Sequence, residues 1–320
     1  MVIEKKKISI VVACFNEREN AEPIYRAIRD VMSALPAYDF EILFIDNGST
    51  DGTDHILRDL AHLDEAHVKV ILNARNFGTV RSHPYGFKQA TGDAIVSISA
   101  DFQDPPEMIP KFVQLWEEGN YIVYAETVRE QNIGILSYIR RVYYAMANKL
   151  SDGNLIENFS GFGLYDRKVI DLFKEIDDPY PYFRGTIAEL GLKRAAVPFV
   201  KPPRRSGDSK NNFLHLYDIA MNGITSHSTT PLHLVTLFGF CLSVLSFIVG
   251  LFYLGYKIYN WESFSVGIAP VVIGLFFFNS VIVFILGLIG EYVAFINVRV
   301  IKFPMVVERE RLNFSKPRET

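Results

Sequence analysis

The stretch EILFIDNGSTDGT, residues 41–53, decides which fold the sequence predicts. It begins as an apolar run typical of a buried strand and ends in polar and small residues that suit a loop. Similar apolar runs lie at residues 8–14, 68–72, 94–99 and 121–125. Residues 19–33 and 105–117 space their apolar side chains at helical intervals. Strands that alternate with helices predict an α/β fold with a mainly parallel sheet covered on both faces.

Polar residues directly follow four of these predicted strands. They lie at residues 16–17, 46–49, 73–76 and 101–104. In parallel sheets ligands bind beyond the carboxyl ends of the strands, so we expect one site built from these clusters. The chain has no G-x-G-x-x-G after its first predicted strand and no P-loop motif, which disfavours a dinucleotide oxidoreductase and a P-loop NTPase.

The composition sets limits on compartment and partners. The chain has 320 residues, 49% of them hydrophobic, and a formal net charge of -3, so no strong field indicates a nucleic-acid partner. Its two cysteines, Cys14 and Cys241, fall in a predicted strand and a predicted membrane helix. No disulfide is expected, which suits a reducing cytosol. The apolar run at residues 8–14 is too short for a secretory signal and is interpreted as the first strand.

The C-terminal third predicts two membrane spans, at about 232–256 and 264–293 within the region 231–297. Residues 234–256 and 264–290 carry no charge, and each stretch exceeds the roughly 20 apolar residues that cross a bilayer. The alternative is a pair of buried helices in a soluble core. It is disfavoured because long helices of soluble proteins normally keep a polar face.

Basic residues flank the predicted spans on both sides. They are Lys193, Arg194, Lys201, Arg204, Arg205 and Lys210 before them, and Arg299, Lys302, Arg309, Arg311, Lys316 and Arg318 after them. Because positive residues stay cytoplasmic, we expect a multi-pass protein of the cell inner (plasma) membrane with both termini inside. The expected organisation is a cytoplasmic domain at 1–212, a juxtamembrane interfacial helix at 213–230 and a cytoplasmic tail at 298–320.

Four motifs together carry a family resemblance. They are ISIVVACFNERENA at 8–21, EILFIDNGSTDGT at 41–53, NARNFG at 73–78 and SADFQDPPEMIP at 99–110. They resemble family 2 glycosyltransferases of the Rossmann-like GT-A fold, above all the polyprenyl-phosphate glycosyltransferases typified by dolichol-phosphate mannose synthase and the bacterial GtrB group. The resemblance covers nearly the whole chain, because the bacterial branch also ends in two membrane helices. It implies a GT-A domain at 1–212.

The implied activity is transfer of a sugar, with glucose favoured, from a UDP-sugar to polyprenyl (undecaprenyl) phosphate. A direct displacement would invert the anomeric configuration of the donor. GDP-mannose is the alternative donor. A processive polysaccharide synthase fits less well, because the chain lacks the Gln-x-x-Arg-Trp motif and has only two predicted spans. A non-catalytic sugar-nucleotide sensor is a further alternative, and the oligomeric state stays open, with a homo-oligomer possible.

The resemblance also assigns donor and metal residues. The expected nucleotide-sugar contacts are Cys14, Asn16, Glu17, Asp46, Asn76 and Asp101. Asp101 is the leading ligand for Mg2+ or Mn2+, with Gln103 as the second, because these cations prefer oxygen ligands and neutralise a leaving diphosphate. Asp101 has an alternative as a helix N-cap ahead of Pro105. Glu17 has one as a solvated carboxylate in a first helical turn.

The sequence departs from the family pattern in two places. Ser99 stands where the family usually has the first aspartate of Asp-x-Asp. Residues 157–163 contain no aspartate, whereas relatives tend to carry a Gly-Asp-Phe acid in this region. Glu157 and Asn158 are the candidates for that acceptor position, and with Asp101 they complete the expected catalytic set. A phosphate acceptor, with a second pKa of about 6, is largely dianionic at neutral pH and needs little help from a general base.

The acceptor phosphate requires cations. The candidates are Arg129, Arg140, Arg141, Arg204, Arg205 and Lys210. Arginine suits a phosphate because it donates two parallel hydrogen bonds. The alternative is a positive collar that faces anionic lipid headgroups. Residues 133–150 and 213–224 have the pattern of interfacial helices, although an ordinary core helix fits the first equally well.

Overall fold

The computed structural model describes residues 5–128, 156, 158–202, 237–242, 244–245, 248, 259, 268–301 and 303–314. In the last long helix, some side chains are also outside the description. The predicted site residues Arg129, Arg140, Arg141, Glu157, Arg204, Arg205 and Lys210 lie outside the described residues, as does most of the first predicted span.

An eight-stranded sheet forms the centre of the described domain, in the order β7-β5-β6-β4-β1-β2-β3-β8. The strands are β1 (Lys7–Cys14), β2 (Asp39–Asp46), β3 (Val68–Asn73), β4 (Ala94–Ser99), β5 (Ile122–Thr127), β6 (Phe159–Asp166), β7 (Arg194–Phe199) and β8 (Glu308–Leu312). Strands β3, β2, β1 and β4 are parallel to one another, and β5 is parallel to β7. Among the described strands, only the pairs β3–β8, β4–β6 and β5–β6 are antiparallel. The prediction of a mainly parallel α/β sheet is confirmed.

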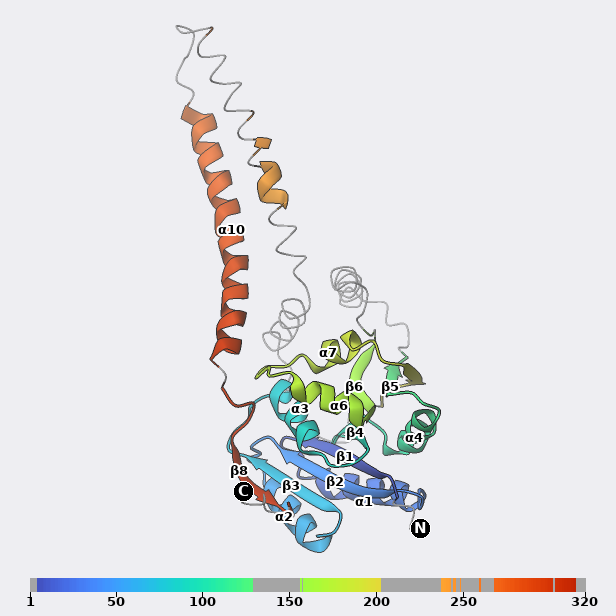
Figure 1. The fold of residues 1–320 in the computed structure, drawn as a ribbon. Helices are drawn as coiled ribbons and strands as arrows, with labels where there is room; N and C mark the ends of the chain where they lie inside the picture. The colour runs from blue at the N-terminus through green and yellow to red at the C-terminus, as the bar shows by residue number, and fades with distance from the viewer. Residues whose placement is uncertain are drawn as a thin grey trace.

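Helices cover both faces of the sheet (Figure 1). They are α1 (Ala21–Ser33), α2 (Thr53–Leu63), α3 (Thr79–Gln89), the 3-10 helix η1 (Pro106–Met108), α4 (Ile109–Glu117), α6 (Arg167–Glu175) and α7 (Phe183–Glu189). Alternating residues of β1 explain the two layers. Ile10 and Val12 pack with α1, α2 and α4, whereas Val11 packs with α3, α6 and α7. Buried β-branched residues on both faces are typical of a central parallel strand.

The C-terminal segment returns to the sheet and completes it. Strand β8 pairs antiparallel with β3 at the sheet edge (Figure 1). Arg58 of α2 donates to Glu310 of β8 at 2.9 and 3.0 Å, and Asn313 donates to the Ala61 and Val68 carbonyls. Part of the segment expected as a tail is therefore a strand that protects the edge of β3.

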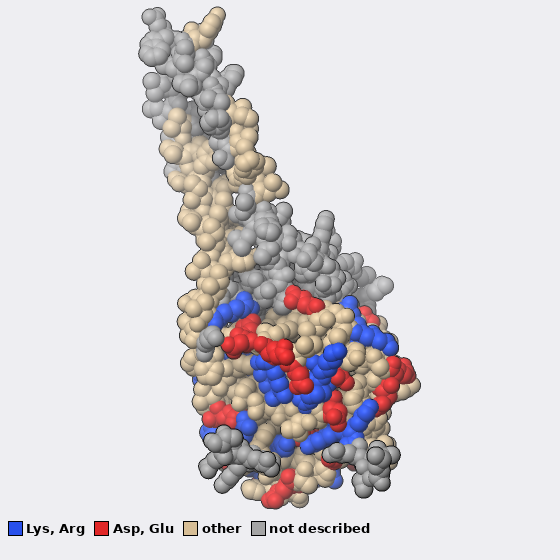
Figure 2. Space-filling view, in the orientation of Figure 1, with Lys and Arg blue, Asp and Glu red and all other residues tan. Residues whose placement is uncertain are grey.

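Helix α10 (Ile268–Val300) projects away from the sheet over 33 residues (Figure 1). Figure 2 shows the charged residues gathered over the sheet domain, whereas the described atoms along the shaft of α10 are neutral on this face. Val283 and Phe284 are 68% and 70% exposed. Over the residues that the structure describes, no helix combines the length and the apolar character that a membrane crossing needs. Both predicted spans stay predictions.

Candidate active site

The carboxyl ends of β1 and β2 bring Asn16 and Asp46 into one loop system. Asn16 has a positive φ of 55°, and its N–H donates to the Ser49 hydroxyl at 2.8 Å. Its side-chain oxygen accepts from the Thr50 N–H at 2.8 Å. Asp46 accepts from the N–H of Ser49 at 3.1 Å and from the Ser49 hydroxyl. Ser49 thus connects Asn16 and Asp46, two predicted contacts of the nucleotide sugar, although Ser49 was not itself among the predicted site residues.

The loop after β3 closes against the same place. Asn47 donates to the side chain of Asn76 at 2.8 Å and accepts from the Phe77 N–H at 2.9 Å. Gly48 has a φ of 73°, and a Cβ atom there would lie 2.5 Å from the backbone carbon of Arg75. Only glycine allows the two loops to approach so closely. Asn76 therefore contacts Asn47, the residue after Asp46. Asn47 belongs to the predicted polar cluster 46–49 but was not among the predicted site residues.

Glu17 occupies the loop between β1 and α1. Its N–H donates to the Thr53 hydroxyl at 2.9 Å, and its carboxylate accepts from the Asn20 side chain at 2.6 Å. The side chain is only partly exposed. Glu17 precedes α1, which begins at Ala21, and so does not lie in the first helical turn that the alternative interpretation assigns to it.

Burial dominates the electrostatics around Cys14 and Asp46. It raises the pKa of the Cys14 thiol well above its ordinary value, and the carboxylates of Asp46, Glu17 and Asp51 add to the effect. Burial also raises the pKa of Asp46, whose side chain is fully buried, although the hydrogen bonds from Ser49 oppose this. A buried carboxylate with a raised pKa costs stability when ionised, which is typical of a functional position.

A second cluster lies at the carboxyl end of β4. The Ser99 hydroxyl is 2.9 Å from Oδ1 of Asp101 and 2.6 Å from Oδ2 of Asp104. Oδ1 of Asp101 also accepts from the Gln103 N–H at 3.1 Å. Asp101 and Asp104 are only 4% and 8% exposed. Phe102, between Asp101 and Gln103, has a φ of 59°, an unusual conformation for a bulky residue.

Asp101 does not cap the following helix. The residue before η1 is Pro105, and no side chain caps that helix. Asp101 accepts instead from within its own turn. The N-cap alternative for Asp101 is therefore wrong.

The β4 cluster fits a divalent cation by its chemistry. Two buried carboxylates and the Gln103 amide offer hard oxygen ligands, and Oδ1 of Asp104 is buried without a hydrogen-bond partner. Within the described residues, no group of three or more His, Cys, Asp or Glu side chains is arranged to hold a metal. A cation here would need further ligands, such as waters or diphosphate oxygens.

The acceptor side of the predicted site is described only in part. Asn158 has a φ of 54°, and its carbonyl accepts from the Thr127 N–H at 3.1 Å, which joins it to the end of β5. Its catalytic role stays a prediction.

Comparisons with known proteins identify relatives that extend along most of the chain. Residues 9–173 match the family model for glycosyl transferase family 2. A prophage bactoprenol glucosyl transferase homolog of Escherichia coli (strain K12) is 33% identical over 90% of this chain and 93% of its own length. A prophage-derived bactoprenol glucosyl transferase of Shigella flexneri is 32% identical over 94% and 97%. An undecaprenyl-phosphate 4-deoxy-4-formamido-L-arabinose transferase of Klebsiella pneumoniae (strain 342) is 29% identical over 90% and 88%.

Proposed function

Because the chain belongs to glycosyl transferase family 2, we propose that it transfers glucose from UDP-glucose to undecaprenyl phosphate. The observation that carries the proposal is the similarity along about nine-tenths of the chain to bactoprenol glucosyl transferases. The relative that acts with undecaprenyl phosphate and a different sugar supports a lipid phosphate as the shared acceptor. The choice of glucose rests on the two glucosyl transferases alone.

The pocket around Asp46 is the proposed site of the nucleoside. An ionised Asp46 carboxylate accepts hydrogen bonds from the base or the ribose, and Asn16 and Ser49 hold the loop around it. Asn76 and the backbone after Cys14 are further proposed contacts of the donor. Glu17 is a further proposed contact of the donor, and its carboxylate accepts a hydrogen bond from the Asn20 side chain.

The cluster after β4 is the proposed site of the donor diphosphate. Asp101 and Gln103 would hold Mg2+ or Mn2+, which supplies charge neutralisation for the leaving diphosphate. Ser99 orients the Asp101 carboxylate through its hydroxyl group. The serine therefore keeps a hydrogen-bonding role at the position where an aspartate is usual.

The proposed reaction is a single displacement. An oxygen of the acceptor phosphate attacks the anomeric carbon and forms a new C–O bond, while the bond from that carbon to the UDP oxygen breaks. UDP leaves with the electron pair, so a UDP-α-glucose donor gives a β-linked lipid phosphate sugar. The dianionic acceptor brings no proton to remove, which explains how the site works without an obvious general base.

We also propose that the C-terminal helices anchor the enzyme in the cell inner membrane with the sheet domain cytoplasmic. Support comes from the uncharged stretch at 264–290 and from exposed apolar side chains of α10 such as Phe284. Arg299, at the end of α10, donates to Asp178 at 3.1 Å, and Arg81 donates to the Pro304 carbonyl at 2.6 Å. These contacts hold the end of α10 and the residues that follow it against the sheet domain, where the donor is proposed to bind.

Replacing Asp46 with asparagine is expected to separate donor binding from stability. The amide still accepts from Ser49 but carries no charge, so UDP affinity should fall by roughly tenfold to a hundredfold. Because the folded-state pKa of Asp46 is raised, its ionised form lowers stability above the unfolded pKa, and the variant should unfold at an equal or higher temperature. Calorimetric titration with UDP and thermal unfolding at pH 7 measure both. Unchanged UDP affinity would remove Asp46 from the donor site.

The test of the proposed function is an acceptor-dependent transfer assay with the full chain in detergent. UDP-glucose, UDP-galactose, UDP-GlcNAc and GDP-mannose are each supplied with and without undecaprenyl phosphate. We expect lipid-linked product from UDP-glucose, only when the lipid phosphate is present. Preference for GDP-mannose would support the mannose-synthase alternative, and UDP-sugar binding without turnover on any acceptor would support a sensor.

A further inference from the structure

Asp104 carries a buried carboxylate oxygen that the described structure leaves unsatisfied. The residue is 8% exposed, and its Oδ1 atom has no hydrogen-bond partner. An unsatisfied buried polar atom costs stability, and the cost is larger for a charged group. Native structures have few such atoms, and each one needs an explanation, such as a bound water, an ion or a catalytic role.

The other oxygen of Asp104 ties the residue to the cluster after β4. Oδ2 accepts from the Ser99 N–H at 3.0 Å and lies 2.6 Å from the Ser99 hydroxyl oxygen. The same hydroxyl oxygen is 2.9 Å from Oδ1 of Asp101. One serine side chain therefore joins the two carboxylates.

The hydroxyl group cannot satisfy both carboxylates at once. It has a single proton and donates to one acceptor at a time. Two ionised carboxylates this close also repel each other, and burial strengthens the repulsion. A divalent cation between them would remove the repulsion and give the unsatisfied oxygen a ligand bond.

We propose that Asp104 is a ligand of the divalent metal, beside Asp101 and Gln103. The inference rests on the proposed function, which places the donor diphosphate at this cluster. Asp104 supplies the second carboxylate of the site, and Ser99 orients the carboxylates through its hydroxyl group. With two carboxylates and one amide from the protein, the remaining positions belong to water and to oxygens of the donor diphosphate.

A purely structural role for Asp104 makes a different prediction. In that role the side chain only holds the backbone of Ser99, and Asp104→Asn can keep the hydrogen bond from the Ser99 N–H. Ser99→Ala removes the hydroxyl contact while leaving both carboxylates in place. The two variants therefore separate a metal ligand from a residue that acts only through Ser99.

The experiment is a titration of Mn2+ into the full-length protein with UDP present and no acceptor. The EPR signal of free Mn2+ measures how much of the cation stays unbound. We expect the dissociation constant of Asp104→Asn to rise at least tenfold. That of Ser99→Ala should rise by a clearly smaller factor, because Ser99 only orients the carboxylates. The matched control is Asp166→Asn, which removes the charge from a carboxylate that accepts from the Lys168 N–H and from Trp116, away from this cluster. It should bind Mn2+ as the wild type does.

A second variant covers the case in which Asp104→Asn does not fold. Asp104→Cys places a thiolate at the same position, and thiolates prefer soft cations such as Cd2+ over Mn2+. We expect this variant to show a Cd2+–thiolate absorption band that wild type, with its own Cys14 and Cys241, does not show.

Two results would overturn the inference. One is Mn2+ affinity within threefold of wild type in Asp104→Asn, and the other is absence of the Cd2+–thiolate band in a folded Asp104→Cys. Because the titration needs no sugar transfer, a wild-type chain that binds Mn2+ with UDP but transfers no sugar would count against the proposed function alone.

Discussion

Replacing Asp101 with asparagine is expected to lower sugar transfer by roughly a thousandfold, equivalent to about 4 kcal/mol of transition-state stabilisation. The amide keeps the shape of the side chain and can still accept from Gln103 and Ser99. What it loses is the negative charge that holds the cation against the leaving diphosphate. Initial rates with UDP-glucose, undecaprenyl phosphate and saturating Mn2+ measure the effect.

The Asp101 experiment needs a control for folding. UDP affinity measured without metal reports the pocket around Asp46, and it should stay within about threefold of wild type because Asp101 lies on a different strand end. Asp166→Asn serves again as the matched carboxylate variant and should transfer sugar at the wild-type rate. Undiminished transfer by Asp101→Asn would remove the metal assignment for this residue.

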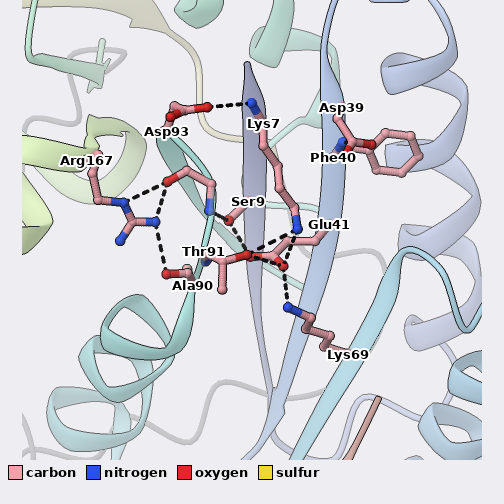
Figure 3. A network of polar contacts seen from close by, with 11 residues as sticks. Lys7, Ser9, Asp39, Phe40, Glu41, Lys69, Ala90, Thr91, Asp93 and Arg167 are labelled. Atoms are coloured by element: carbon pink, nitrogen blue, oxygen red, sulfur yellow. Dashed lines mark hydrogen bonds and ion pairs between the residues drawn. The ribbon is translucent and has the colours of Figure 1, made fainter. Parts of the chain in front are cut away.

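Replacing Glu41 with glutamine is expected to cause the largest loss of stability among single-charge changes in the sheet domain. Glu41 lies at the amino end of the sheet, on β2, and only 1% of the residue is exposed. Its carboxylate accepts from Lys69 at 2.7 Å and from both the N–H and the hydroxyl of Thr91, and Lys7 lies 3.0 Å away (Figure 3). Ser9 donates to it at 2.5 Å.

These contacts outweigh the cost of burial. Burial alone would raise the pKa of Glu41, but the hydrogen bonds from Lys69, Ser9 and Thr91 lower it from 4.5 to about 2. A lowered folded-state pKa contributes stability above the unfolded pKa, amounting here to about 3 kcal/mol. Removing one member of a buried ion pair has a cost of similar size. Glu41→Gln should therefore lower the free energy of unfolding by about 3 kcal/mol at pH 7.

The pH dependence gives the Glu41 prediction a second test. As the pH falls from 4.5 toward 2, wild-type Glu41 becomes protonated and its advantage over glutamine should disappear. Urea unfolding of both proteins at several pH values measures this. The control is Glu22→Gln, which breaks an exposed pair with Arg26 on α1 and should change stability by less than about 0.5 kcal/mol. Equal stability of wild type and Glu41→Gln at pH 7 would contradict the account.

The sequence predicts the centre of the sheet well because each parallel strand there is a continuous apolar run. The runs at 8–14 and 94–99 match the ends of β1 and β4 to within one residue. Strand β8 could not be found in the same way. Its sequence, ERERL, has four charged residues, and it is a strand because Arg58 and the edge of β3 pair with it.

The candidate site could also be predicted in part from the positions of the strands. Asp46, Asn76 and Asp101 stand directly after predicted strands, so the topology alone brings them to one edge of the sheet. Ser49, Asn47 and Asp104 were harder to identify as site residues, because their roles depend on loop conformations with positive φ values at Gly48 and Phe102. All three lie in the polar clusters that follow the predicted strands, but cluster membership alone does not tell which side chains contact one another.

The most direct test of the central claim is the mass of the lipid product made from UDP-glucose and undecaprenyl phosphate. The account predicts one new species, heavier than the acceptor by a single hexose, that forms together with an equal amount of UDP and is absent when the lipid phosphate is omitted. A ladder of species carrying several hexoses, or UDP release without any lipid-linked sugar, would contradict it.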